Sequence, residues 1–310
     1  MSQSLHTRPP GRHRRPGPHA RSSLFENRGA PHGAEITPAE PDPGHAGEGS
    51  RLPVPRALTI AASDSGGGAG IQADLKAFAA AGAHGMSAIV ALTAQNTVAV
   101  TAVHELPPEF VLAQLDAVFD DIGVDAVKTG MLHSRRMIET VAAYLADRRV
   151  PLVVDPVMVA SSGAALLQDD AVEALVTLLF PLATVVTPNL HEAIALAGDL
   201  ESRAELARAL HDRGAAAVVV TGGHGEPPVD LLFDGADCIE IPVDRFEVAA
   251  THGAGCTHSA TLAALLARGA PLEEAARGAA RAAGEAVRHG LAELGAGEGP
   301  VDILNVKGAA

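Results

Sequence analysis

The segment Thr251–Thr257 (THGAGCT) places small residues and a cysteine just before an alanine-rich stretch. Glycines let the backbone approach a ligand closely, and the first N–H groups of a helix have no partner within the helix. If a helix begins at Ala254, these groups and the helix dipole form a binding site for an anion such as a phosphate group. Gly253, Ala254 and Gly255 are therefore candidate residues of an anion hole.

Cys256 would lie in the first turn of that helix, where the dipole lowers the pKa of a thiol. Such a thiol could deprotonate a substrate hydroxyl group while the N–H groups stabilise charge on a transferring phosphoryl group. The alternative is a small buried side chain, which is the usual role of a free cysteine. The only other cysteine is Cys238, so no disulfide scaffold or zinc-type spacing is present and a reducing cytoplasm is expected.

Oxygen-bearing side chains follow two further apolar runs. Asp155 ends the run PLVVD, and Asn189 and Glu192 follow the run TVVT. A few carboxylates together with phosphate oxygens are the ligands that Mg²⁺ prefers. Asn189 and Glu192 also have the spacing of a helix N-cap and its capping-box partner. Both interpretations can hold together, because a cap residue can also face a ligand.

A glycine-rich turn, Ser63–Gly70 (SDSGGGAG), lies between an apolar run and an amphipathic stretch that contains Asp74. The pattern from Gly68 loosely fits a dinucleotide-binding fingerprint, but the next apolar run leads into TAQN without the acid that would hold a ribose. We therefore expect the glycines to bring the backbone close to a small ligand. Asp74 would face that ligand or, alternatively, only complement the helix dipole. No G-x-x-x-x-G-K-[ST] motif occurs, which excludes a P-loop enzyme.

Short apolar runs alternate with amphipathic stretches along the chain, which predicts an α/β fold with a parallel sheet covered on both faces. Ligands bind beyond the carboxyl ends of such strands. The unusual residues lie at those ends, including Gln95, Lys128–Met131 and Gly222–Gly223. We predict strands at 57–62, 87–93, 126–129, 151–155, 184–187 and 216–221, a hairpin at 230–233 and 238–242, and helices at 71–81, 107–122, 134–147, 169–180, 190–197, 203–213, 254–267 and 272–289.

The chain of 310 residues carries 37 acidic residues against 23 Lys and Arg. This acidity argues against a nucleic-acid-binding protein, which needs a basic face. No apolar run of about 18 residues is present, so no membrane span is expected. Residues 1–54 lack apolar periodicity, which predicts a disordered extension, although their arginines loosely resemble a transit peptide. A single domain is predicted over residues 55–310.

Together these motifs resemble the hydroxymethylpyrimidine and phosphomethylpyrimidine kinases of thiamine biosynthesis, within the ribokinase-like superfamily. The resemblance covers roughly residues 56–290, beginning with the long stretch around SDSGGGAGIQAD. VKTGML, VVDPVMVASSG, TPNLHEA, VVVTGGH and THGAGCTHSATLAA follow in the order of the family. It implies a three-layer α/β/α ribokinase-like fold with a mostly parallel central sheet. It also implies a homodimer that uses ATP with Mg²⁺ and binds neither nucleic acid nor a membrane.

The resemblance further implies a role for each candidate residue. The substrate would be a phosphorylated hydroxymethylpyrimidine and also the free alcohol. Lys128 matches a lysine of the family, but the sequence assigns no role to it. The implied roles are catalysis for Cys256, Gly253 and Gly255, substrate binding for Asp74, Gln95, Gly68, Met131 and Val157, ATP binding for Asn189, Thr221, Gly223 and Ala254, and metal binding for Glu192 and Asp155.

The chain departs from the family pattern at three places. Ala62 and Ser65-Gly66 replace residues of the first glycine motif, and Ala254 replaces a threonine of the last motif. Thr221 stands where the family commonly has a lysine beside the phosphates. Three alternatives therefore stay open: a pyridoxal kinase of the same superfamily, a dinucleotide-dependent oxidoreductase, and a protein that binds the pyrimidine without turning over ATP.

Overall fold

The computed structural model describes residues 54–159, 163, 166–223 and 227–309. The predicted disordered extension, residues 1–54, therefore lies outside the described residues apart from Val54. The unit Arg51–Ala310 is compact in its own right. None of the helices in the described ranges is long and apolar enough to cross a membrane.

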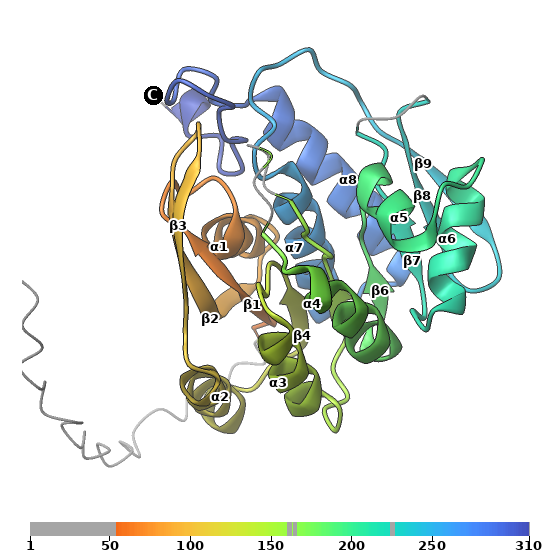
Figure 1. Ribbon diagram of the computed structural model, residues 1–310. Coiled ribbons are helices and arrows are strands. Elements are labelled where there is room, and N and C mark those ends of the chain that lie inside the picture. Colours follow the sequence, from red (N-terminus) through yellow and green to blue (C-terminus); the bar gives the residue numbers. More distant parts are fainter. Residues whose placement is uncertain (1–53, 160–162, 164–165, 224–226, 310) are drawn as a thin grey trace, which may run out of the picture. The chain divides into compact units, whose positions relative to one another are not determined.

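A nine-stranded sheet forms the centre of this unit, in the order β3-β2-β1-β4-β5-β6-β7-β8-β9 (Figure 1). Six neighbouring strands of this order, β2-β1-β4-β5-β6-β7, pair in parallel. The pairs β3 with β2, β8 with β7, and β9 with β8 are antiparallel. The mostly parallel sheet that was predicted is thus confirmed. The strands are β1 (Arg56–Asp64), β2 (His84–Gln95), β3 (Val100–Glu105), β4 (Ala126–Thr129), β5 (Leu152–Val154), β6 (Val185–Val186), β7 (Val218–Val220), β8 (Val229–Phe233) and β9 (Cys238–Pro242).

Helices cover both faces of the sheet, because successive strand residues alternate between two apolar cores. Leu58 and Val154 belong to the larger core, whereas Ala57 and Val153 belong to the other. The larger core packs against α2 (Pro108–Ala117), α3 (Arg135–Leu145), α4 (Asp169–Ala174), α5 (Leu190–Ala197) and α6 (Arg203–Asp212). The second core packs against α1 (Gly70–Ala80), α7 (Ala254–Ala267) and α8 (Leu272–Arg288). This is the expected three-layer arrangement.

Short irregular turns extend two helices of the larger core. A π-helical turn, Val118–Ile122, continues α2, so the predicted helix over 107–122 is present but changes its winding. The turns Leu175–Leu179 and Phe180–Leu182 continue α4 in the same way. The chain ends in a short 3₁₀ turn, Lys307–Ala309.

Strand β3 is the element that the sequence pattern does not predict. Its residues are exposed along most of its length, and it pairs with β2 alone at the edge of the sheet. An edge strand without a buried face carries no apolar run, which is the signal that identifies the other strands.

Candidate active site

A cavity of about 780 Å³ lies beyond the carboxyl ends of the parallel strands, against the first turn of α7. Its wall contains residues that follow β1, β2, β4, β5, β6 and β7, as expected for an open α/β sheet. The sequence prediction that these strand ends converge is confirmed. Of the candidate residues, the cavity is lined by Gln95, Met131, Asp155, Val157, Asn189, Glu192, Thr221, Gly223, Gly253, Ala254, Gly255 and Cys256.

The turn before α7 depends on close contact between two loops. Gly253 has φ +87°, and a Cβ atom there would lie 1.8 Å from the carbonyl oxygen of Gly68. Only glycine fits such a position. Gly255 faces open space, so the first turn of α7 is open to the cavity. The N–H of Ala254 donates to the carbonyl oxygen of Thr251 at 3.0 Å, so the anion hole predicted at Gly253–Gly255 would depend on the other N–H groups of this turn and stays a prediction.

The thiol of Cys256 is not activated in the ligand-free protein. Burial raises its pKa to about 12, and the positive charge of Lys128, which favours the thiolate, is opposed by Asp74 and Asp155. The expectation that the pKa of this thiol is lowered is wrong, because burial disfavours the charged thiolate at this site. Cys256 is therefore protonated near neutral pH. A thiol in this state fits a hydrogen-bonding role toward a ligand better than the role of a general base.

Asp74 does not line the cavity and its side chain is fully buried. Nζ of Lys128 donates to both carboxylate oxygens of Asp74, at 2.9 and 3.0 Å, and Thr59 Oγ1 donates to it at 2.6 Å. We expected Asp74 to contact a substrate, but its carboxylate is the counter-ion of Lys128. Lys128 is the member of the pair that forms part of the cavity wall. Burial lowers the pKa of a lysine, yet the neighbouring carboxylates leave the pKa of Lys128 raised overall.

Asp155 connects this ion pair to the anion hole. Its Oδ2 atom lies 3.8 Å from Lys128 Nζ and accepts a hydrogen bond of 2.8 Å from Ser259 Oγ. Ser259 also donates to the carbonyl oxygen of Gly255 at 3.0 Å. A continuous polar chain thus runs from α1 through β4 and β5 to the first turn of α7. It fixes the position of Cys256 relative to the strand ends.

Asn189 and Glu192 form the capping box of α5. Asn189 Oδ1 accepts from the backbone N–H of Glu192, and Glu192 Oε2 accepts from that of Asn189, both at 3.0 Å. The capping interpretation is confirmed, and both residues also line the cavity, where their metal-binding role stays a prediction. Burial and the nearby charge of Asp155 raise the pKa of Glu192 to about 8. The carboxyl groups of Glu192 and Asp155 therefore resist ionising together. A cation bound between them would stabilise both negative charges.

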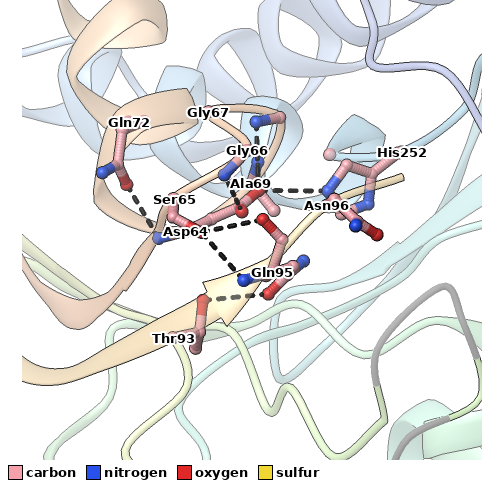
Figure 2. A network of polar contacts seen from close by, with 12 residues as sticks. Asp64, Ser65, Gly66, Gly67, Ala69, Gln72, Thr93, Gln95, Asn96 and His252 are labelled. Atoms are coloured by element: carbon pink, nitrogen blue, oxygen red, sulfur yellow. Dashed lines mark hydrogen bonds and ion pairs between the residues drawn. The ribbon is translucent and has the colours of Figure 1, made fainter. Parts of the chain in front are cut away.

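Gln95 is held at the end of β2 by the glycine-rich turn (Figure 2). Ser65 Oγ donates to the carbonyl oxygen of Gln95 at 2.7 Å and accepts from its N–H at 2.8 Å. The side-chain oxygen Oε1 lies 3.2 Å from Thr93 Oγ1, whose single proton is shared with the nearer carbonyl oxygen of Ser63 at 3.0 Å. The backbone of Gln95 is therefore held in place at the cavity, and Thr93 favours one orientation of its amide.

Asp64 organises the glycine-rich turn at the end of β1 (Figure 2). Its carboxylate accepts from the N–H groups of Gly66, Gly68 and Ala69 at 2.7 to 3.0 Å, and it lies 3.2 Å from His252 Nε2. Burial opposes ionisation, but these donors lower the pKa of Asp64. The pair joins the turn before α1 to the turn before α7.

Gly68 does not line the cavity, in contrast to its predicted place in the substrate pocket. A Cβ atom at Gly68 would lie 2.3 Å from Cδ2 of His252. The position requires glycine because the two loops pack against each other there. The sequence motif marks a packing requirement at this residue.

Several cavity residues carry no signal in the sequence that would identify them. Part of α8 contributes small apolar side chains at helical spacing, which is indistinguishable from a core stripe. The segment after β9 follows no motif. Two polar residues, Thr187 and His258, lie buried in the wall within otherwise recognisable motifs. These additional lining residues include Val243, Arg245, Phe246, Ala280, Ala283, Gly284 and Val287.

Comparison with known proteins assigns this architecture to one family. Residues 64–302 match the model of the family described as phosphomethylpyrimidine kinase. A hydroxymethylpyrimidine/phosphomethylpyrimidine kinase of Rhizobium meliloti is 52% identical over 253 residues, which covers 79% of this chain and 95% of the relative. A relative of the same description from Synechococcus elongatus is 45% identical over 260 residues, covering 81% of this chain and 97% of the relative.

Solved structures with the same fold include two kinds of kinase. The ADP complex of Bacillus subtilis pyridoxal kinase has a TM-score of 0.75 at 38% identity, covering 82% of this chain and 99% of its own. A phosphomethylpyrimidine kinase from Clostridium difficile has a TM-score of 0.65 at 39% identity, and the match covers 73% of this chain and 96% of the kinase. The ribokinase-like fold that was predicted is therefore confirmed.

Proposed function

This chain belongs to the phosphomethylpyrimidine kinase family, and from that premise we propose that it phosphorylates 4-amino-5-hydroxymethyl-2-methylpyrimidine phosphate with ATP. The product is the diphosphate used in thiamine biosynthesis, and the free alcohol is a second substrate. The observation that carries this proposal is that one cavity holds both the open first turn of α7 with Cys256 and the oriented amide of Gln95. The first suits a transferring phosphoryl group, and the second suits an aminopyrimidine ring.

Two parts of the cavity are assigned on this basis. The acceptor end is the part lined by Gln95, Met131 and Val157. The nucleotide end is the part lined by Asn189, Thr221 and Gly223. Cys256 and the anion hole would lie between the two bound substrates, where the transfer takes place.

The chemistry follows from these positions. A bond forms between the acceptor oxygen and the γ-phosphorus of ATP, and the bond from that phosphorus to the bridging oxygen of ADP breaks. The N–H groups of the first turn of α7 stabilise the charge on the phosphoryl oxygens. Because Cys256 is protonated before ligands bind, its thiol first orients the acceptor oxygen. The acceptor proton leaves late, as expected for a loose transition state, and passes to an oxygen of the transferred phosphoryl group.

We also propose that Mg²⁺ accompanies ATP at Asp155 and Glu192. Asp155, Glu192 and Thr187 all present oxygen atoms in the cavity wall. The pKa of Glu192 is raised, and the hydroxyl of Thr187 has no hydrogen-bond partner among the described residues. No cluster of three His, Cys, Asp or Glu residues able to hold a metal occurs among the residues described, so phosphate oxygens would complete the shell. When bound, the ion would neutralise charge on the phosphates.

Pyridoxal is the competing acceptor. The pyridoxal kinase of Bacillus subtilis has the higher TM-score of the two solved structures compared above, 0.75 against 0.65. The curated relatives compared above, at 52% and 45% identity, are instead pyrimidine kinases. The acceptor specificity therefore has to be measured by direct competition.

The test is ADP release by the purified protein with Mg-ATP and one of three acceptors: hydroxymethylpyrimidine, its phosphate, or pyridoxal. We expect kcat/KM for the pyrimidines to exceed that for pyridoxal by at least about tenfold. Turnover of pyridoxal alone would move the assignment to the sister enzymes. ATP binding without turnover of any acceptor would indicate a protein that has lost the kinase activity.

We propose in addition that the protein is a homodimer. The exposed edge strand β3 supports this, because an unpaired edge is a template for pairing with a second chain. Light scattering coupled to gel filtration would give twice the mass of the chain. A monomer at micromolar concentration would contradict the proposal.

The cytoplasm is the proposed site of action. Cys238 and Cys256 are both free thiols, which suits a reducing compartment. Cell fractionation followed by immunoblotting would detect the protein with cytoplasmic enzymes. Recovery from any other fraction would refute this assignment.

A further inference from the structure

His258 is a buried histidine on α7 that the reaction described above does not use. It lines the cavity, and its residue is only 4% exposed. Its Nε2 atom lies 3.2 Å from Oδ2 of Asp230, but neither ring nitrogen completes a hydrogen bond with the described residues. Buried polar groups nearly always have a partner, so this ring has hydrogen-bonding capacity left for a ligand.

Asp230 connects His258 to the nucleotide end of the cavity. Asp230 lies on β8, is 3% exposed, and accepts a hydrogen bond of 2.7 Å from the backbone N–H of Gly222 through Oδ1. The carboxylate of Asp230 therefore contacts two elements. Its Oδ1 atom contacts the turn after β7, and its Oδ2 atom contacts His258 on α7. A buried carboxylate is stable only with such donors around it.

The turn that Asp230 anchors has a fixed position. A Cβ atom at Gly222 would lie 1.8 Å from the carbonyl oxygen of Val229, so the backbone there packs directly on the start of β8. Gly223 lines the cavity, and no atom of the described residues lies within 4 Å of its Cβ position. The turn thus presents an open backbone surface beside His258.

The charge of the cavity wall indicates why an imidazole matters at this end. Thr221 is uncharged, and carboxylates such as Asp155, Glu192 and Asp230 outnumber the cations Arg245 and Lys128 in the wall. Lys128 is committed to Asp74 beneath the acceptor end. A di- or triphosphate entering such a wall needs N–H donors, which imidazole supplies and carboxylates do not.

We propose that His258, oriented by Asp230, recognises the phosphate groups of the bound nucleotide beside the Gly222–Gly223 turn. His258 contacts the ligand, whereas Asp230 is a positioning residue that acts through the imidazole and through Gly222. This rests on the proposed function only in taking the ligand to be a nucleotide. The identity of the acceptor does not enter it.

The test measures binding of adenosine, ADP and ATP by calorimetry in the absence of any acceptor. In His258→Leu we expect the Kd for ADP and ATP to rise about tenfold while the Kd for adenosine changes less than about twofold. His258→Gln, which keeps an N–H donor, should recover most of the loss, and Thr221→Lys in the His258→Leu background should restore ATP binding by adding a cation. His84→Gln, at an exposed position at the start of β2, is the matched control and should bind all three ligands normally.

Several outcomes would overturn the proposal. Unchanged ATP binding in His258→Leu would remove the role of the imidazole. An equal loss for adenosine and ATP would place the residue at the adenosine moiety or in general packing. If His258→Leu does not fold, the ring nitrogen signals of His258 in the wild-type protein decide the question, assigned by their absence in His258→Gln. They must shift with ADP and stay unchanged with adenosine.

This experiment separates the two proposals. If His258→Leu loses phosphate recognition and the wild-type protein turns over no pyrimidine, the role of His258 stands and the proposed acceptor is refuted. If the wild-type protein turns over pyrimidines and His258→Leu binds ATP normally, the acceptor stands and the role of His258 is refuted.

Discussion

The acceptor end of the cavity is held by buried charged side chains, whereas the nucleotide end is held by backbone turns that require glycine. Asp74, Lys128 and Asp155 form a network of charged groups beneath the first end. Gly222 packs on Val229 at the second end, and one carboxylate anchors it. Removing a charge should therefore damage the acceptor end most, and adding a methyl group should damage the nucleotide end most.

The largest effect is expected for Cys256, which lies between the two ends. Cys256→Ala should lower kcat with the pyrimidine acceptor by at least about a hundredfold, because the acceptor oxygen loses its orienting partner. Binding of ATP, measured by calorimetry, should change little. Cys256→Ser should recover part of kcat, since a hydroxyl group also forms hydrogen bonds. Full activity in the alanine variant would show that the thiol takes no part in the reaction.

Lys128→Met tests the network beneath the acceptor end. It leaves Asp74 buried without a counter-ion and should lower the free energy of unfolding by about 3 to 5 kcal/mol in urea titrations. The double variant Asp74→Leu/Lys128→Met should regain part of this stability, because the buried carboxylate of Asp74 is removed with its counter-ion and only Asp155 loses a cationic neighbour. It should remain nearly inactive, because the cavity wall loses its lysine. Lys76→Met, at an exposed lysine on α1, is the matched control. A stable and fully active double variant would show that the pair of Asp74 and Lys128 is not needed for activity.

Glu192 gives the ligand-free protein a pH dependence. Its pKa is about 8 in the folded protein against 4.5 as the ordinary value. Between these values the folded state holds a proton that the unfolded state has released, so the free energy of unfolding falls as the pH rises, by about 2 to 4 kcal/mol. Glu192→Gln should flatten this slope in urea titrations between pH 5 and about 8. Mg-ATP should also flatten it, and removal of the metal with a chelator should restore it.

Gly222→Ala and Gly223→Ala form a matched pair at the nucleotide end. The first places a methyl group 1.8 Å from Val229 O, whereas the second meets no atom within 4 Å. Gly222→Ala should lower the free energy of unfolding by about 1 to 3 kcal/mol and weaken ATP binding. Gly223→Ala should leave the stability within about 0.5 kcal/mol of wild type. Equal stability of the two variants would mean that the turn can move aside.

Removal of residues 1–54 should have the smallest effect. The family match begins at residue 64, and β1 begins at Arg56. The truncated protein should therefore retain kcat and KM for both substrates within about twofold. A large loss of activity would refute the view that these residues are a passive extension.

The sequence by itself determined the order of the elements other than β3 and, approximately, where they end. Buried parallel strands are short apolar runs, and ligand-binding residues follow them directly, so Gln95, Asp155 and Asn189 could be placed at the cavity. The glycine of the turn before α7 is also visible as a motif, although the contact between Gly253 and Gly68 that requires it joins two distant loops. The edge strand β3 has no buried face and hence no local signal.

Only the tertiary structure decided which side chains face the cavity and which lie beneath it. Asp74 and Lys128 are 54 positions apart, and their pairing depends on how α1 packs against β4. The pKa of Cys256 rises because the assembled fold partly shields its thiol from water. The contact between His258 and Asp230 likewise joins a helix and a strand that no local pattern connects. Burial and charge pairing depend on distance in space, and the sequence specifies those distances only through the complete fold.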